Sequence, residues 1–407
     1  MNARDADNGE PSMSYAAPFA GLKVIDLSQG VAGPYCGMLL AQHGANVIKV
    51  EPTGEGDWAR TLGRRYGGHT AYSIPTNLGK RSIALDLKSD EGKQVLWRLT
   101  GGADVLIEGF RPGVLERLGF GYDAVSRREP RILYLSVSGF GQAGPFSGRP
   151  AMDPVLQAFT GLMMDNKGED GIPHRVPFVI IDMSTALYAF QALAAALYAR
   201  RYEPRGRRIE VSLLEAASAI QAIRMMMVYL EGENVKRAMP SGVFKTADGW
   251  LQLLVIRDDS WVHFCAAIGR PELATDQRFV DGDARALNEA ELMAIVRPVI
   301  ATKPTAYWAE RLREADIMHE RLNGFRELLE HPQAEAIGLI SWLEPDGPPA
   351  AIPMANIAGV APFASASTRV VTPVLGQHSA DILREHGLSA SDITSLMERG
   401  IVAQIGT

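Results

Sequence analysis

Cysteine is scarce in this chain, which has two such residues among 407, Cys36 and Cys265, far apart in the sequence. This count excludes a disulfide framework and a structural zinc site. The eight histidines include no pair spaced i, i+4, so no His-rich metal site is indicated and we expect no bound metal. A chain of this length can bury a core that is stable without disulfides or a structural metal.

A basic excess and a long uncharged apolar run are also missing. The 41 Lys and Arg residues against 47 Asp and Glu give a net charge of −6, which argues against a general nucleic-acid-binding protein. Residues 1–17 lack the basic start and apolar run of a signal peptide, and we expect them to form a disordered leader. The most apolar stretch, 177–199, contains Asp182 and Gln191, which favours a buried helix over a membrane span. We therefore expect a cytoplasmic protein with no membrane or nucleic-acid partner.

Predicted strands and helices alternate through about residue 200. A strand at 23–27, a loop at 28–34, a helix at 35–43 ended by Gly44 and a strand at 46–50 form a β-loop-α-β unit, which implies a parallel sheet. Further strands are predicted at 82–87, 104–107, 131–136 and 209–213, and further helices at 90–99, 183–201 and 214–230. The run Met225–Met227 is expected to fill the core. This alternation favours an α/β fold with a large Rossmann-like domain and an open, mostly parallel sheet.

A smaller α+β domain is predicted next. Residues 243–246 and 250–256, joined by Asp248-Gly249, are typical of a β-hairpin, and short helices follow it. We predict a large domain at 18–235 and a small domain at 243–333. The segment 334–407 is expected to return and pack on the large domain, with a helix at 379–386.

The loop Gln29–Pro34 joins a predicted strand to a helix, and the free N–H groups of a helix start suit a phosphate. Glu51 ends the following strand, where nicotinamide-dinucleotide enzymes carry an acid that binds the ribose. The G-x-G-x-x-G pattern is absent, so a tight strand-to-helix turn is the competing interpretation.

The segment from Arg60 to Arg117 contains ten basic and six acidic residues, within a chain that is acidic overall. Such an excess would steer a polyanionic small molecule to this segment. A solvated helix face is an equally good explanation of the same residues.

Asp182 stands between the apolar run 177–181 and the predicted helix 183–201. It would be a helix N-cap, a position that Asp often occupies. It could also be a carboxylate nucleophile, because open α/β sheets bind ligands at the carboxyl ends of their strands. Hydrogen bonds from the helix amides would keep its side chain ionised at pH 7.

These residues belong to an ordered set of segments that resembles the family III CoA-transferases, a group with formyl-CoA and carnitine CoA-transferases and the related α-methylacyl-CoA racemases. The matching segments are Gly33-Pro34, Gly44–Pro52, Gly56-Asp57, Lys80–Lys88, Phe110–Gly113, Leu118-Gly119, Ser138–Gly141, Gly144-Pro145, Asp182, Asp248-Gly249, Gly269–Leu273 and Asp276–Phe279. The likeness covers about residues 19–400.

The resemblance implies a homodimer of two interlocked subunits, each with a large Rossmann-like and a small domain. It implies that Asp182 is the nucleophile, and that coenzyme A is a substrate carrier rather than a permanently bound cofactor. The positions implied to contact CoA are Val31, Ala32, Pro52, Leu85, Lys88, Gly109, Phe110, Arg111, Arg117, Ala151, Met152 and Asp153. The phosphates of CoA would then explain the basic segment.

Four positions depart from the family pattern. Gly109 replaces an Asn, and Pro52 replaces an Arg that some relatives have. Val31 stands where oxalate-using members carry Gln, which counts against formyl or oxalyl transfer. Met152 replaces the His of the racemases, and a thioether cannot shuttle a proton at an α-carbon.

The leading hypothesis is therefore transfer of CoA from an acyl-CoA to a free acid through a mixed anhydride and a thioester of Asp182. Backbone N–H groups of a small-domain loop would stabilise the oxyanion, and Asp153 is a candidate for positioning the substrate. Arg60, Arg64 and Arg65 suggest an acceptor with a second carboxylate. Epimerisation of an acyl-CoA, a nicotinamide-dependent dehydrogenase and a non-catalytic acyl-CoA-binding module stay open as alternatives.

Overall fold

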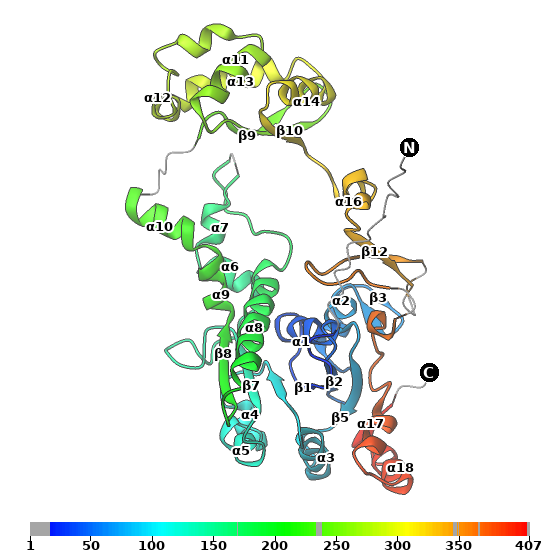
Figure 1. The fold of residues 1–407 in the computed structure, drawn as a ribbon. Helices are drawn as coiled ribbons and strands as arrows, with labels where there is room; N and C mark the ends of the chain where they lie inside the picture. Colours follow the sequence, from blue (N-terminus) through cyan, green and yellow to red (C-terminus); the bar gives the residue numbers. More distant parts are fainter. Residues whose placement is uncertain are drawn as a thin grey trace, which may run out of the picture. The chain divides into compact units, whose positions relative to one another are not determined.

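A computed structural model describes residues 17–168, 170–232, 238–344, 348, 350–364 and 367–404 (Figure 1). The chain divides into two compact units, the first made of the residues up to 222 and those from 336 onward, the second of residues 223–335. The sequence had placed the first boundary at 235. The predicted leader lies outside the described residues except for Ala17.

The first unit is built on a seven-stranded sheet with the order β14-β5-β2-β1-β6-β7-β8. Its strands are β1 (Lys23–Asp26), β2 (Asn46–Glu51), β5 (Arg81–Leu85), β6 (Val105–Glu108), β7 (Leu133–Ser138), β8 (Arg207–Ser212) and β14 (Val402–Ala403). All neighbours pair in parallel except β14, which runs antiparallel to β5. The predicted mostly parallel sheet is therefore confirmed.

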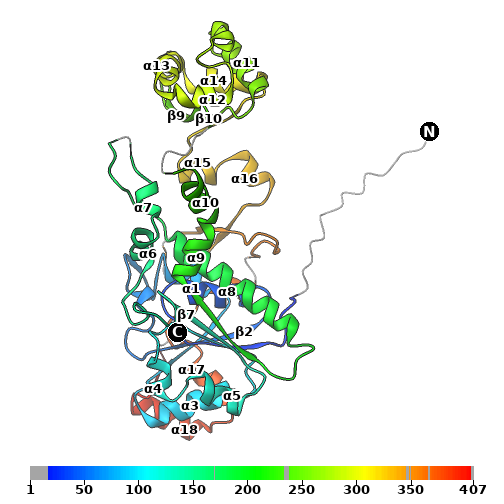
Figure 2. The ribbon, with the colours of Figure 1, turned by 90° about the vertical axis from the view of Figure 1, so that its left-hand side faces the viewer.

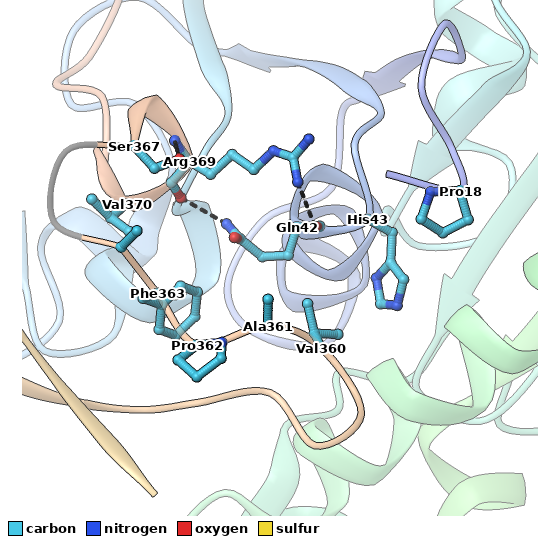
Figure 3. Close-up of a pocket in the computed structure, with 11 residues that line it drawn as sticks. Pro18, Gln42, His43, Val360, Ala361, Pro362, Phe363, Ser367, Arg369 and Val370 are labelled. Atoms are coloured by element: carbon cyan, nitrogen blue, oxygen red, sulfur yellow. Dashed lines mark hydrogen bonds between the residues drawn. The ribbon is translucent and has the colours of Figure 1, made fainter. Parts of the chain in front are cut away.

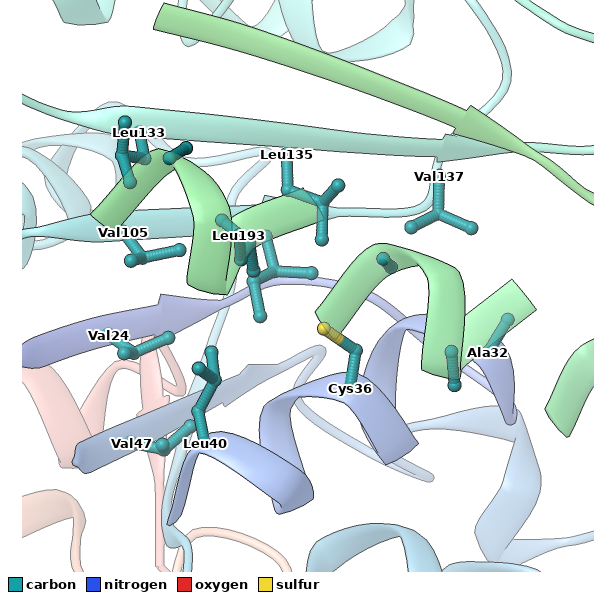
Figure 4. Packing of buried hydrophobic residues seen from close by; sticks show 14 of the residues in the cluster. Val24, Ala32, Cys36, Leu40, Val47, Val105, Leu133, Leu135, Val137 and Leu193 are labelled. Atoms are coloured by element: carbon teal, nitrogen blue, oxygen red, sulfur yellow. The ribbon is translucent and has the colours of Figure 1, made fainter. Parts of the chain in front are cut away.

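Both faces of this sheet are covered by helices (Figure 2). One face carries α1 (Ala32–Gln42), α8 (Ile180–Ala199) and α9 (Leu213–Ile220). The other carries α3 (Asp90–Thr100), α4 (Val114–Leu118), α5 (Tyr122–Arg128), α17 (Ser379–Glu385) and α18 (Ala390–Glu398). Neighbouring residues of a strand face opposite layers. Val24 packs against α1 and α8 (Figure 4), and Ile25 packs against the helices of the other face. Burial on both sides explains why the central strands β6 and β7 are largely apolar.

Shorter elements of the first unit surround the sheet. They are η1 (Trp58–Arg60), β3 (Arg65–Tyr66), β4 (His69–Thr70), α2 (Ser73–Asn77), α6 (Asp153–Phe159), α7 (Leu162–Asp165), β12 (Ile340–Leu343), β13 (Ile352–Ala355) and η3 (Thr368–Val370). Within the described residues, α8 is the helix whose length and composition would suffice to cross a membrane, joined by α9 and α10 (Ala222–Glu231) if that bent pair counts as one span. Ile181, Ala189 and Leu193 of α8 belong to the core cluster.

One predicted helix is broken in two. The residues predicted as a single helix at 214–230 form α9 and α10, which meet at an angle of 62°. None of the described residues of α10 is buried, and Met225 and Met226 are 49% and 59% exposed. Their predicted role in the core is therefore wrong. The apolar periodicity of the sequence continues through the break and therefore does not predict it. At the bend, the Gln221 side chain donates hydrogen bonds to the Thr160 hydroxyl and to the Ala217 carbonyl.

The second unit holds a three-stranded antiparallel sheet, β11-β10-β9, with helices packed against it. Helix α10 belongs to this unit from Ile223 onward. The other elements are β9 (Ser241–Lys245), β10 (Trp250–Leu254), α11 (Asp258–Ala267), η2 (Pro271–Thr275), α12 (Gly282–Leu287), α13 (Glu289–Ile300), α14 (Thr305–Glu314), β11 (Met318–Arg321), α15 (Phe325–Leu329) and α16 (Pro332–Ala336), the last of which ends at the boundary. The predicted hairpin forms, and the Thr246 N–H bonds the Gly249 carbonyl across its turn.

Candidate active site

The carboxyl edge of the main sheet contains a topological switch point. From the central strand β1 the chain adds β2 and β5 on one side, and then β6, β7 and β8 on the other. The loops that follow β1 and β6 consequently diverge between these two strands, where open α/β sheets bind ligands. The two loops touch: a Cβ built on Gly109 would lie 3.4 Å from the Cβ of Ser28. That is ordinary contact, so the close approach does not require glycine at position 109.

The loop after β1 is held by groups of the protein itself. The Asp57 carboxylate accepts the N–H groups of Gly30 and Ala59 at 2.8 and 2.9 Å. Gly30 has a φ of +83°, and a Cβ built there would lie 2.0 Å from the ring of Trp58. Helix α1 begins at Ala32, three residues earlier than predicted, because Gly33 lets it start directly against Ser28. Since the Gly30 amide is already bonded, the tight-turn interpretation of this loop is the better one.

A buried network of three ion pairs lies beneath this loop. Lys80 contacts Asp26 at 2.7 Å, Lys49 contacts Asp57 at 2.8 Å, and Arg60 contacts Glu51 at 2.6 Å. These six side chains are 5% exposed or less, and their formal charges cancel. Charges that interrupt the apolar strands β1 and β2 were the signal in the sequence that could have revealed the network.

Glu51 and Arg60 are therefore not ligand-binding residues. Arg60 donates to both carboxylate oxygens of Glu51, and Ser82 donates to one of them. Burial by itself would raise the pKa of Glu51, but the hydrogen bonds and charge of Arg60 outweigh it and hold that pKa below its usual value. The ribose-binding role of Glu51 is wrong, and so is the role of Arg60 in binding a second carboxylate.

Most of the ten cations in the predicted basic segment have partners within the protein. Arg60, Arg65, Lys80, Arg81 and Lys93 form ion pairs, and Arg64 lies over the ring of Tyr66. Arg98 lies in the last turn of α3. The exposed cations Lys88, Arg111 and Arg117 have no ion pair within the described part of the chain. The basic surface at the sheet edge thus reduces to these three residues.

The positions implied to contact CoA all fall at the carboxyl edge. They are Val31 and Ala32 after β1, Pro52 after β2, Leu85 and Lys88 at the end of β5, Gly109, Phe110, Arg111 and Arg117 after β6, and Ala151, Met152 and Asp153 after β7. Val31, Ala32 and Leu85 are buried, so they offer little surface to a ligand.

Glu108 supports the loop after β6 and was missed at the sequence level. Its carboxylate accepts the Phe110 N–H at 2.9 Å, next to the exposed Arg111. Burial raises the pKa of Glu108 to about 7, although the neighbouring Ser136 hydroxyl and the hydrogen bond from the Phe110 N–H oppose this effect. An acid at the end of the apolar strand β6 was the available signal.

Asp182 lies inside the first turn of α8 and does not cap it. The helix begins at Ile180, and its N-cap, Val179, makes no side-chain cap. The capping carboxylate belongs to Asp153, 29 residues earlier, whose Oδ2 accepts the N–H groups of Ile181 and Asp182 at 2.7 and 3.1 Å. The predicted N-cap role of Asp182 is wrong, because a residue distant in the sequence occupies the amides.

The Asp182 carboxyl is left without those stabilising bonds. Burial, and secondarily the charge of Asp153, raises the pKa of Asp182 from 3.8 to about 7. The expectation that amide hydrogen bonds would keep this side chain ionised at pH 7 is therefore wrong. Near neutral pH the group exists in both its anionic and its protonated form.

Two cavities of the first unit lie elsewhere. One, of 110 Å³, is found at the C-terminal end of α1, where Gln42 and Arg369 bond to each other's backbone (Figure 3). That end of α1 lies at the opposite edge of the sheet from Asp182. The other, of 490 Å³, is lined mainly by apolar residues of α2 and β13 such as Ile74 and Met354. In the described ranges, no group of three or more His, Cys, Asp or Glu side chains is placed to hold a metal.

Comparisons with known proteins agree on one family. The family profile CoA-transferase family III matches residues 19–379. The acetyl-CoA:oxalate CoA-transferase of Acetobacter aceti is 36% identical over 79% of this chain and 85% of its own length. The human succinyl-CoA:glutarate CoA-transferase is 30% identical over 97% and 92%. The crystal structure of Rv3272 from Mycobacterium tuberculosis superimposes with a TM-score of 0.79 and 32% identity, over 90% of this chain and 99% of that one.

Proposed function

Since the chain belongs to CoA-transferase family III and is therefore a CoA-transferase, we propose that it moves CoA from an acyl-CoA to a free dicarboxylic acid through Asp182. The observation that carries this assignment is the Asp182 carboxyl: it lies at the carboxyl edge of the sheet, and its pKa is raised to about 7. The oxalate and glutarate used by the two relatives are dicarboxylic acids, which supports this class of acceptor.

In the first half-reaction the Asp182 carboxylate attacks the thioester carbonyl of the donor. The carbon–sulfur bond breaks, and CoA leaves as a thiolate while a mixed anhydride forms. The thiolate then attacks the Asp182 carbonyl carbon, which releases the donor acid and leaves an aspartyl-CoA thioester. The acceptor carboxylate runs the same two steps in reverse, so no proton is gained or lost overall. A poorly solvated carboxylate suits this role, because it is more nucleophilic than one bonded to several donors.

Three exposed cations would bind the phosphate groups of CoA. Lys88 follows β5, while Arg111 and Arg117 follow β6, and both strands end at the edge that holds Asp182. Each can donate charge-assisted hydrogen bonds to a phosphate. Glu108 would act through the loop that it braces, because it fixes the backbone next to Arg111.

The proposal includes the interlocked homodimer that the resemblance implies. Its support is the apolar surface of α10, where Ile223, Tyr229 and Leu230 are 80%, 86% and 69% exposed. A surface of that kind on one chain marks a contact with another protein, here a second copy. Light scattering after gel filtration tests this part: we expect twice the mass of one chain, and a single-chain mass would overturn it.

The covalent step is tested by trapping the enzyme-bound CoA. Wild-type protein incubated with succinyl-CoA should gain the mass of CoA less one water, and hydroxylamine should remove the CoA and leave a hydroxamate. Asp182→Ala should show no adduct and no transfer. Asp123→Ala is the matched control, because Asp123 is an exposed acid in the first turn of another helix, α5. Transfer by Asp182→Ala at a rate close to that of the wild type would refute the assignment.

A further inference from the structure

We propose that Asp153 is a positioning residue for the transfer reaction: it holds the N-terminal amides of α8 and so denies them to Asp182. This inference rests on the proposed function. Its basis is that two carboxylates lie at the start of one helix and only one of them has hydrogen-bond donors.

Both carboxylate oxygens of Asp153 accept hydrogen bonds from within the protein. Its Oδ2 accepts from the N–H groups of Ile181 and Asp182, and its Oδ1 accepts from the Gln157 side chain at 2.6 Å. Gln157 also bonds both backbone groups of Val176, at 2.9 and 3.2 Å, and so ties the segment before α8 to α6. Asp153 is 2% exposed, which leaves it no path to donate to or accept from a substrate. Asp153 therefore bonds to the backbone of the helix that carries the nucleophile, and it does not contact the reacting atoms.

Among the charged residues on the elements that pack against α8, Asp153 is the one whose charge raises the pKa of Asp182. Helix α1 and strand β7 carry no charged residue, and Asp153 is the one charged residue of α6. On α9, Glu215 bonds to Ser212 in a capping box. The charged residues of β8 are paired with other acids or bases, as Arg207 is with Glu203 and Arg208 with Glu210.

The binding of the α8 amides by Asp153 instead of Asp182 affects the reactivity of Asp182. An N-terminal helix turn offers N–H groups and a positive dipole end, and both would stabilise the anion of any carboxylate that reached them. A carboxylate stabilised in that way has a low pKa and is a weak nucleophile. Because Asp153 takes the amides and adds a negative charge nearby, Asp182 keeps the higher basicity that attack on a thioester requires.

The test compares the pH dependence of kcat/KM for succinyl-CoA in three proteins. Asp153→Asn keeps an oxygen that can cap α8 but removes the charge, so we expect the acid limb of the profile to move down by about one pH unit. Asp153→Ala also frees the amides for Asp182. We expect its acid limb to move further and its kcat at pH 8 to fall about tenfold or more, while KM stays within twofold. Asp123→Asn is the control and should leave the profile unchanged.

An acid limb that keeps its wild-type position in Asp153→Asn would overturn the inference. Far-UV circular dichroism of each variant shows whether it has folded, and the isosteric Asn variant decides the question if the Ala variant has not. The proposed function fails in a different way: wild-type enzyme would then form no hydroxylamine-sensitive adduct. An adduct in the wild type together with an unmoved acid limb refutes only the role of Asp153.

Discussion

Replacing the proposed nucleophile should stabilise the protein at alkaline pH, and the sign follows from the pKa of Asp182. Burial raises that pKa from 3.8 to about 7 in the folded chain. Between these two values the folded state holds a proton that the unfolded state has lost, so stability falls as the pH rises from about 4 to 7. The ionised carboxylate of Asp182 therefore costs the folded state free energy. This cost is fully present above pH 7 and absent below pH 4. Asp182→Asn, which is nearly isosteric and neutral, removes this cost.

The size of the effect follows from the shift. A difference of about three pKa units corresponds to at most about 4 kcal/mol of unfolding free energy. Asp182 is partly accessible to solvent, and the dipole of α8 favours its anion. Both effects reduce the cost, and we expect Asp182→Asn to be about 2 kcal/mol more stable than the wild type at pH 8. At pH 5 the gain should be less than half as large, because the cost builds up between the two pKa values and pH 5 lies near the lower one.

Urea unfolding followed by far-UV circular dichroism measures both values, with Asp123→Asn as the control for a surface carboxylate. The expected result is a midpoint that rises in Asp182→Asn at both pH values, and more at pH 8 than at pH 5. An equal gain at both pH values would show that the effect does not come from the charge. A loss of stability at pH 8 would refute the reasoning, since the ionised carboxylate would then be stabilising.

Three further predictions test other parts of the structure. Arg60→Met leaves the Glu51 carboxylate buried without its partner, and we expect urea unfolding to show a loss of about 3–5 kcal/mol; a loss below 1 kcal/mol (the range of exposed pairs) would contradict the buried pair. Gly37→Ala places a Cβ 2.8 Å from the Asp26 carboxylate, so the melting temperature should fall by several degrees; an unchanged value would mean that α1 can move away at little cost. Arg111→Ala should raise KM for the acyl-CoA about tenfold with kcat within twofold, as expected for one lost charge-assisted hydrogen bond, and an unchanged KM would exclude Arg111 from binding CoA.

The alternation of strands and helices could be predicted because each element buries a continuous apolar face. Strand β1 was expected at 23–27 and is found at Lys23–Asp26, and strand β2 was expected at 46–50 and is found at Asn46–Glu51. The placement of the candidate site at one sheet edge followed from this order, because parallel strands end at the same edge. These parts depend on local periodicity, which the chain carries at every position.

The roles of individual charged residues could not be predicted in the same way. Glu51 has the position of a ribose-binding acid, yet it is bonded to Arg60 and Ser82 in the interior. Asp182 has the position of an N-cap, yet Asp153 supplies the cap. In both cases the partner comes from another element, and nothing in the local sequence indicates which side chains will meet.

The sequence by itself determined the parallel sheet, the family and the aspartate proposed as the nucleophile, because these depend on residue order and on short motifs. Only the tertiary structure decided which charges are paired in the interior and which are left to act on a ligand. The physical reason is that the pKa of a carboxylate and its capacity to bind or react depend on burial and on the nearest donors. Those donors are assembled by folding from segments that are distant in the chain, as the amides of α8 and the carboxylate of Asp153 show.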